Sequence, residues 1–156
     1  MPTPILLDTN VLVLVAVGLT NIEYIPKHKR LQAFDEQDFR IVSSLIEQSS
    51  GVVFCPNILT ETSNLVRYIG DPMRSEIAAT LASMTRRTEE RFVASSDAMN
   101  RPEYNRLGLA DAVLLTLAET GATVLTDDLG LYIAATTKGL NAINYNHFRE
   151  LRTDFR

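Results

Sequence analysis

The sequence has few of the residues that build disulfides and zinc sites. Cys55 is the one cysteine, so no disulfide can form within the chain, and the two histidines, His28 and His147, are far apart. A zinc site made of thiolates and imidazoles is therefore not expected. Cys55 ends the apolar run 52–55, and we expect it to be a buried structural thiol.

Long apolar runs and an excess of basic residues are also missing. The apolar run 5–19 is shorter than the roughly 20 residues of a transmembrane helix, contains Asp8 and Asn10, and follows no basic segment. We therefore expect a cytoplasmic protein. Lys and Arg number 15 against 19 Asp and Glu, a net charge of −4. A protein that simply coats nucleic acid usually has a basic excess, so any RNA must be bound locally or through a metal ion.

The length and pattern of the chain predict one α/β domain over residues 1–156. With 156 residues, 46% of them hydrophobic, the chain can bury a core of its own. Strands are expected at 5–7, 51–55, 91–94, 122–125 and 141–144. Helices are expected from 35 to about 50, over 58–69, from 71 to about 84, and over 107–119 and 129–137. Periodicity leaves 11–19 open between helix and strand, and 20–33 reads as a loop. The alternation predicts a three-layer α/β/α sandwich with a mostly parallel central sheet.

Acidic residues follow two of the expected strands. Asp8 ends the first strand, and Asp127 and Asp128 end a later one. Open parallel sheets bind ligands beyond the carboxyl ends of their strands, so these side chains are expected to face one crevice. Each could instead cap the helix that follows it, which Asp does well.

Two further acids lie on apolar helix stripes. Glu61 comes three residues after Ile58 and four before Leu65, and Asp111 comes four after Leu107. A carboxylate directed at a core is costly unless it is paired, neutralised or bound to a metal. For one such residue a satisfied hydrogen bond is the simpler explanation, but two of them with two acidic strand ends favour a shared cation.

Basic partners are missing from the same positions. No Lys or Arg falls on these stripes or strand ends. Carboxylates without neighbouring His or Cys suit Mg²⁺ or Mn²⁺ better than zinc. Such ions activate water and stabilise charge on a phosphate, which makes phosphodiester hydrolysis the leading chemistry.

Four motifs in this order resemble the PIN domain, and in particular the VapC-like toxin ribonucleases of toxin–antitoxin pairs. They are ILLDTNVL (5–12), LTETSNL (59–65), LADA (109–112) and LTDD (125–128). The resemblance implies a metal-dependent endoribonuclease with the α/β/α fold, often a homodimer, with an antitoxin partner in toxin members. The metal-binding catalytic acids that it implies are Asp8, Glu61, Asp111 and Asp128, with Asp127 as an additional ligand. Its polar supporting residues would be Thr9, Asn10, Asn64 and Thr126.

One departure concerns the interval between Asp8 and Glu61, which is longer than a compact VapC-like toxin would have. The excess falls in 20–33, which carries Lys27, Lys29 and Arg30. These side chains either contact substrate phosphates or form a solvated basic loop.

Other functions have less support. There is no phosphate-binding P-loop and no Gly-x-Ser-x-Gly elbow. An aspartyl phosphatase would need a second Asp at the position of Asn10. The hypotheses that remain are the endoribonuclease, a PIN-fold module that binds RNA or protein without cutting, and a metal phosphatase acting on small phosphates.

Overall fold

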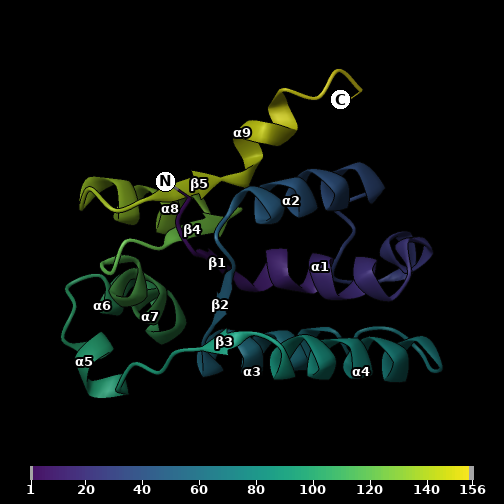
Figure 1. Ribbon diagram of the computed structural model, residues 1–156, viewed down its shortest axis with the longest axis horizontal. Coiled ribbons are helices and arrows are strands. Elements are labelled where there is room, and N and C mark those ends of the chain that lie inside the picture. The colour runs from purple at the N-terminus through teal and green to yellow at the C-terminus, as the bar shows by residue number, and fades with distance from the viewer. Residues whose placement is uncertain (1, 155–156) are drawn as a thin grey trace.

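A single parallel sheet forms the centre of the molecule (Figure 1), and the computed structural model describes residues 2–154. Within these residues, five strands follow the order β3-β2-β1-β4-β5, and every neighbouring pair is parallel. They are β1 (Ile5–Leu7), β2 (Val52–Phe54), β3 (Glu89–Glu90), β4 (Thr123–Thr126) and β5 (Ala142–Asn144). The α/β prediction is confirmed, and the sheet is parallel throughout.

Helices link the strands and cover both faces of the sheet. The helices are α1 (Thr9–Thr20), the 3-10 helix η1 (Ile22–Lys27), α2 (Glu36–Gln48), α3 (Pro56–Leu65), α4 (Met73–Arg86), α5 (Ser95–Met99), α6 (Tyr104–Leu107), α7 (Leu109–Ala118), α8 (Leu129–Thr137) and α9 (Tyr145–Glu150). The connections from β1 to β2 and from β2 to β3 run toward one edge of the sheet. Those from β3 to β4 and from β4 to β5 run toward the opposite edge. Because such crossovers are right-handed, α2 and α4 lie on the face opposite α7 and α8. None of these helices, in the part of the chain described, is both long and apolar enough to cross a membrane.

The segment left open between helix and strand is the helix α1. It lies between α2 and α4 (Figure 1), and every residue from Val11 to Val17 is buried. A helix covered on all sides needs no polar face, which is why its sequence shows no helical periodicity. Asp8 caps the helix by accepting a hydrogen bond from the backbone N–H of Thr9 at 2.8 Å.

The expectation of a loop over 20–33 is wrong. This segment contains η1 and a series of turns in which Ile25, His28 and Leu31 each accept a backbone hydrogen bond from the residue three positions later. Turns of this kind bring every third residue to the same side. Ile25, His28 and Leu31 are all buried, so the segment packs against the core despite its polar sequence.

Several helix ends differ from the prediction. Asp35 caps α2 as expected, in a capping box with Asp38. Asp71 does not cap α4 in the expected way, because the helix begins at Met73. The expected helix over 107–119 is divided at Gly108, whose φ of +91° is accessible to glycine and breaks the helix between α6 and α7. The strand expected at 91–94 lies slightly earlier, at β3.

Candidate metal centre

The acidic residues that follow strands lie side by side at one edge of the sheet. β1 and β4 are direct neighbours, and the backbone N–H of Asp8 donates to the carbonyl of Leu125 at 3.0 Å. Asp127 and Asp128 follow β4 immediately, so both acidic strand ends lie at the same edge of the sheet, and we call the region beyond these strand ends the acidic crevice. The capping role that was the alternative is also present, since Asp8 caps α1 and Asp128 caps α8. Capping therefore holds the carboxylates of Asp8 and Asp128 beyond the ends of the strands, and it is compatible with a role in metal binding there.

Hydrogen bonds from the predicted supporting residues tie the acids together. Each comes from a side chain within two residues of an acid in the sequence and reaches an acid on a different element. The hydroxyl of Thr126 donates to Asp8 at 2.6 Å, the hydroxyl of Thr9 donates to Glu61 at 2.8 Å, and the amide of Asn10 donates to Asp127 at 3.3 Å. Three of the four proposed supports therefore orient carboxylates. The fourth, Asn64, is exposed and makes none of the side-chain hydrogen bonds found among residues 2–154.

Asp111 has the most perturbed carboxyl group of the cluster. Burial, and then the negative charges of three other carboxylates, raise its pKa to about 7. Those carboxylates are Asp8, Asp128 and Glu61. The side chain comes from the first turn of α7. Because the charges of Asp8, Asp128 and Glu61 all act on Asp111, these four acids lie in one region of the molecule.

Asp8 is the most buried of these acids, with 9% of its surface exposed. Burial raises its pKa, the hydrogen bond from Thr126 and the backbone N–H of Thr9 oppose that rise, and the charges of Asp127 and Asp128 add to it. The two hydrogen bonds favour the ionised carboxylate that a metal ligand must be.

The prediction that Glu61 points toward the core is wrong, because this side chain is exposed. The buried stripe of α3 and the following turn instead runs through Ile58, Thr62, Val66 and Ile69. Thr62 is fully buried although it is a polar residue. The buried stripe of this helix could therefore not be recognised in the sequence as a series of apolar residues. Glu61 lies beside that stripe, where the hydroxyl of Thr9 holds it at the crevice.

The cluster has no basic counterpart. Within residues 2–154, no ion pair joins Asp8, Glu61, Asp111 or Asp128 to a lysine or arginine. This agrees with the absence of basic residues from these positions in the sequence. Four converging carboxylates without a cation repel one another, and a divalent ion would relieve that repulsion.

Carboxylate oxygens are ligands that suit Mg²⁺ or Mn²⁺, but these acids are not spaced closely enough for three of them to bind one ion directly. No three His, Cys, Asp or Glu side chains in the described part of the chain lie close enough to hold one ion. Mg²⁺ usually binds one or two carboxylates directly and keeps several waters, which reach ligands further away. Asp8 and Asp111 are the residues best placed to hold such an ion, because both are partly or fully removed from solvent.

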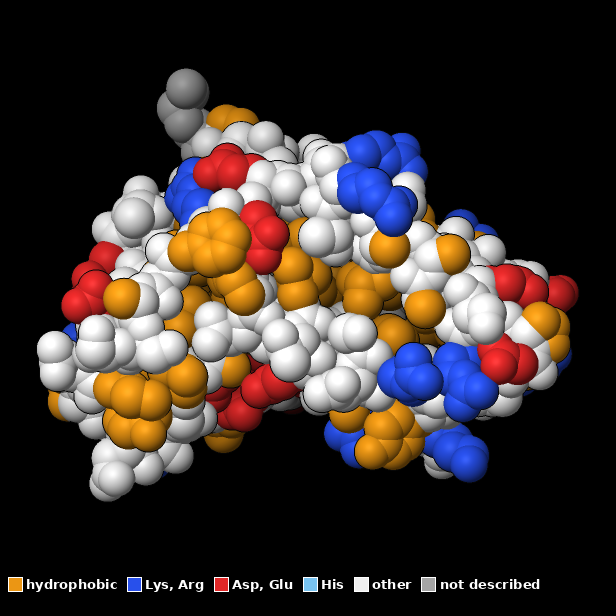
Figure 2. Space-filling view, turned by 90° about the horizontal axis from the view of Figure 1, so that it is seen from below, with side chains coloured by type: hydrophobic (Ala, Val, Ile, Leu, Met, Phe, Trp, Pro, Cys, Tyr) orange, Lys and Arg blue, Asp and Glu red, His pale blue; other side chains and the backbone are white. Residues whose placement is uncertain are grey.

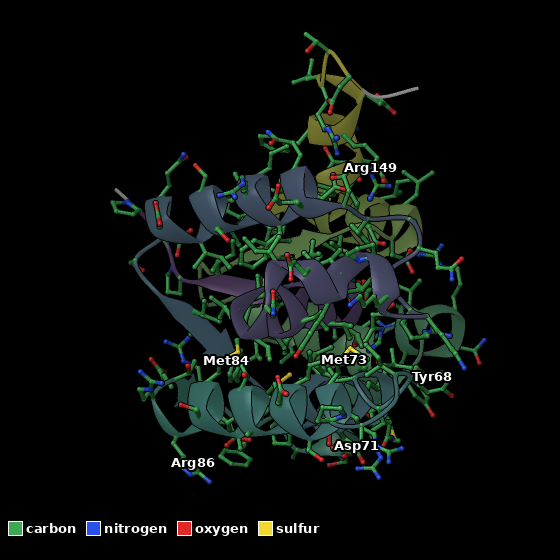
Figure 3. The ribbon with its side chains drawn as sticks, turned by 90° about the vertical axis from the view of Figure 1, so that its right-hand side faces the viewer. Tyr68, Asp71, Met73, Met84, Arg86 and Arg149 are labelled. Atoms are coloured by element: carbon green, nitrogen blue, oxygen red, sulfur yellow. The ribbon has the colours of Figure 1, made fainter. Side chains whose placement is uncertain are left out.

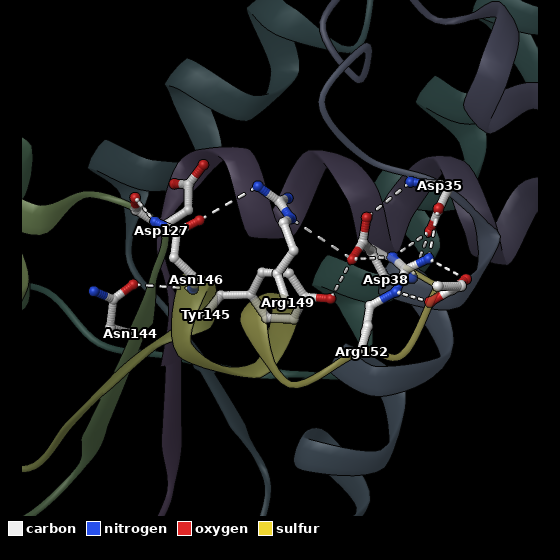
Figure 4. A network of polar contacts seen from close by, with 9 residues as sticks. Asp35, Asp38, Asp127, Asn144, Tyr145, Asn146, Arg149 and Arg152 are labelled. Carbon is white, nitrogen blue, oxygen red and sulfur yellow. Dashed lines mark hydrogen bonds and ion pairs between the residues drawn. The ribbon is translucent and has the colours of Figure 1, made fainter. Parts of the chain in front are cut away.

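Residues from the C-terminal helix also reach the site, and the sequence reasoning missed them. The amide of Asn146 donates to the backbone carbonyl of Asp127 at 2.9 Å (Figure 4). Asn146 lies in the first turn of α9 (Tyr145–Glu150), which follows β5 directly, and Asn144 at the end of β5 caps this helix. Polar residues after a strand were the signal that found Asp8, and the same signal was present here.

A polar network holds α9 against α2 (Figure 4). Arg152 donates to Asp35 at 2.8 Å and to Asp38 at 2.9 Å, and the hydroxyl of Tyr145 donates to Asp38 at 2.5 Å. The hydrogen bond from Arg152 lowers the pKa of Asp35 to about 2. Asn146 thus connects the turn after β4 to a helix that is itself fixed on α2.

Lys27, Lys29 and Arg30 belong to a different part of the surface, near the turn that joins α3 to α4.

Comparison with known proteins gives no match to this chain, neither among the protein-family models nor among the curated proteins.

Proposed function

We propose that this protein is a metal-dependent endoribonuclease of the PIN-domain type. The observation that carries the proposal is that four carboxylates, two following β1 and β4 and two from α3 and α7, lie near one another without a basic partner. The order and the positions of the four PIN-like motifs support it further, because each motif supplies one of these acids. Mg²⁺ or Mn²⁺ bound there would supply an activated water and stabilise negative charge on the phosphate.

Hydrogen bonds from neighbouring residues hold the acids of this site in place. Hydrogen bonds from Thr126 and from the backbone of Thr9 favour the ionised form of Asp8, and the hydroxyl of Thr9 orients Glu61. The pKa of Asp111 is raised to about 7, and a cation held beside it would favour the ionised carboxylate. Asn10 and Asn146 fix the side chain and the carbonyl of Asp127.

The test is cleavage of mixed RNAs by the purified protein with Mn²⁺, with Mg²⁺ and with EDTA. We expect cleavage only with metal, and a fall of at least about 100-fold for Asp8→Asn and Asp111→Asn, because even outer partners of metal ligands contribute about 10- to 100-fold. Asp97→Asn is the matched control, since Asp97 is exposed on α5. Cleavage unchanged by both site variants would contradict the assignment.

The main alternative is a PIN-fold protein that binds RNA or protein without cutting. The observation in its favour is that no closed cage of three metal-ligating side chains exists among residues 2–154. Absence of metal-dependent cleavage at high enzyme concentration, with RNA binding retained, would favour it. Release of phosphate from a small chromogenic ester instead of RNA cleavage would favour the phosphatase.

We also propose that the nuclease acts as the toxin of a toxin–antitoxin pair, and that it forms a homodimer. An apolar groove of about 790 Å³ between α1, α2 and α4 supports a protein partner. Val15, Ile46, Phe54 and Met84 line it, and Figure 3 shows Met84 on the side of α4 that faces α1. Expression should arrest growth for the native protein and not for Asp8→Asn. Light scattering after gel filtration tests the dimer.

A further inference from the structure

Exposed basic side chains come from the two chain segments that meet at Tyr68, on a surface that the metal site does not use. Lys27, Lys29 and Arg30 come from the segment before α2, and Arg67 and Tyr68 from the turn after α3. The guanidinium carbon of Arg30 lies 5.6 Å from the centre of the Tyr68 ring, and the backbone N–H of Lys29 donates to the Tyr68 carbonyl at 3.3 Å. We call these five residues the basic–aromatic surface.

His28 holds the two segments of the basic–aromatic surface together. Its ring is fully buried, with Nε2 3.1 Å from the carbonyl of Val66, and Nδ1 accepts from the backbone N–H of Arg30 at 3.1 Å. With Nδ1 as an acceptor, Nε2 carries the proton and donates to Val66. Burial lowers the pKa of His28, so the ring is neutral and this arrangement persists at physiological pH. The surface is therefore preorganised, which lowers the entropic cost of binding.

The basic side chains of this surface have no acidic partners. None of Lys27, Lys29, Arg30 and Arg67 forms an ion pair within residues 2–154, whereas the nearby Arg74 is paired with Asp71 at 2.9 Å. Figure 2, which looks at the side of α3 and α4, shows Lys and Arg side chains gathered toward the right-hand end. In a chain with a net charge of −4, a local group of unpaired cations is suited to an anionic ligand.

The basic–aromatic surface begins close to the acidic crevice. Tyr68 follows Glu61 by seven residues along α3 and the turn that continues it, in which the backbone N–H of Tyr68 donates to Leu65 at 3.2 Å. Seven residues of helix span about 10 Å. Figure 3 shows Tyr68 at the end of α4 where Asp71 lies, with Arg86 at the other end. A strand that reaches the crevice beside Glu61 can therefore continue over Tyr68.

We infer that the basic–aromatic surface binds single-stranded RNA and guides it toward the acidic crevice, an inference that rests on the proposed nuclease function. The four cations contact phosphates, and an unpaired base stacks on the ring of Tyr68, which is 48% exposed. Bases in a duplex are already stacked on one another and cannot reach the ring, so the surface selects unpaired segments.

Binding in EDTA tests this inference separately from cleavage. The probe is a fluorescein-labelled 20-nucleotide oligo(U), followed by anisotropy at several salt concentrations. Tyr68→Ala should weaken binding by about 5- to 100-fold, the contribution of one stacked base, and Tyr68→Phe should retain it. Arg30→Ala should weaken binding and reduce its salt dependence by about one phosphate contact. Arg86→Ala is the matched control, because Arg86 is exposed and lies at the far end of α4.

Equal affinity for Tyr68→Ala, Arg86→Ala and the native protein would overturn the inference, as would equal binding of a duplex of the same length. Circular dichroism melting checks that each variant is folded. Oligo(U) binding that depends on Tyr68, without metal-dependent cleavage, would support the RNA surface and reject the nuclease. Metal-dependent cleavage with binding that does not depend on Tyr68 would do the reverse.

Discussion

Replacing Asp111 with asparagine should stabilise the protein in EDTA and should remove the metal-dependent activity that we propose. Above pH 7 the native carboxyl is charged in the folded and the unfolded chain, but only the folded chain places it in a desolvated, negatively charged crevice. Because its pKa is higher when folded, the folded protein holds an extra proton between pH 4 and pH 7, and native stability rises as the pH falls. Asparagine carries no charge and avoids the repulsion at every pH.

The size of the effect follows from the pKa of Asp111, which rises from 3.8 to about 7. At about 1.36 kcal/mol per pKa unit the upper limit is about 4 kcal/mol, and screening by solvent around this partly exposed group reduces it to about 1–2 kcal/mol. In a chain of this size, 1 kcal/mol shifts the Tm by about 2–4 °C. The Tm at pH 8 should therefore rise by about 2–8 °C.

The assay is thermal unfolding of both proteins in EDTA at pH 8 and at pH 5. The variant should be more stable at pH 8, and the difference should shrink at pH 5, where the native carboxyl is protonated. Adding Mn²⁺ at pH 8 should raise the Tm of the native protein more than that of the variant, because ligand binding stabilises only the state that binds. An equal gain at both pH values, or none, would refute the electrostatic reasoning.

Two further predictions concern packing and the C-terminal helix. A Cβ at Gly18 would lie 2.2 Å from the ring of Phe39, so Gly18→Ala should destabilise the fold by about 1–3 kcal/mol, while Gly70→Ala, where nothing lies within 4 Å, should not. Arg152→Ala should cost about 2–4 kcal/mol in urea unfolding, because it removes an ion pair from the buried carboxylate of Asp38. A midpoint like that of the native protein would contradict either prediction.

The fold and the convergence of acids could be predicted because both depend on local rules. Strands and helices alternate visibly, and a polar residue after a parallel strand always reaches the same edge of the sheet. Asp8 and Asp127 were located on this basis, and the cap at Asp35 was recognised from the residues around it. None of this needed knowledge of distant contacts.

The parts that were missed depend on contacts between segments far apart in the sequence. Glu61 was assigned to the wrong face of α3 because the buried stripe contains Thr62, whose burial is set by neighbouring elements. α9 is too short to show periodicity, and its position is fixed by ion pairs to α2, more than 100 residues earlier. The buried turns of 20–33 were hidden by polar residues on their outer side.

Because β1 pairs with β4, which comes late in the chain, the site can assemble only late in synthesis. Asp8 is translated near the start, yet its partners Asp127 and Asp128 arrive only with β4, which pairs directly with β1 at the centre of the sheet. A ribosome-bound chain that has not yet exposed β4 lacks both the central strand pairing and the carboxylates of Asp127 and Asp128. A site that needs Asp127 and Asp128 is therefore incomplete until β4 and the residues after it have left the ribosome.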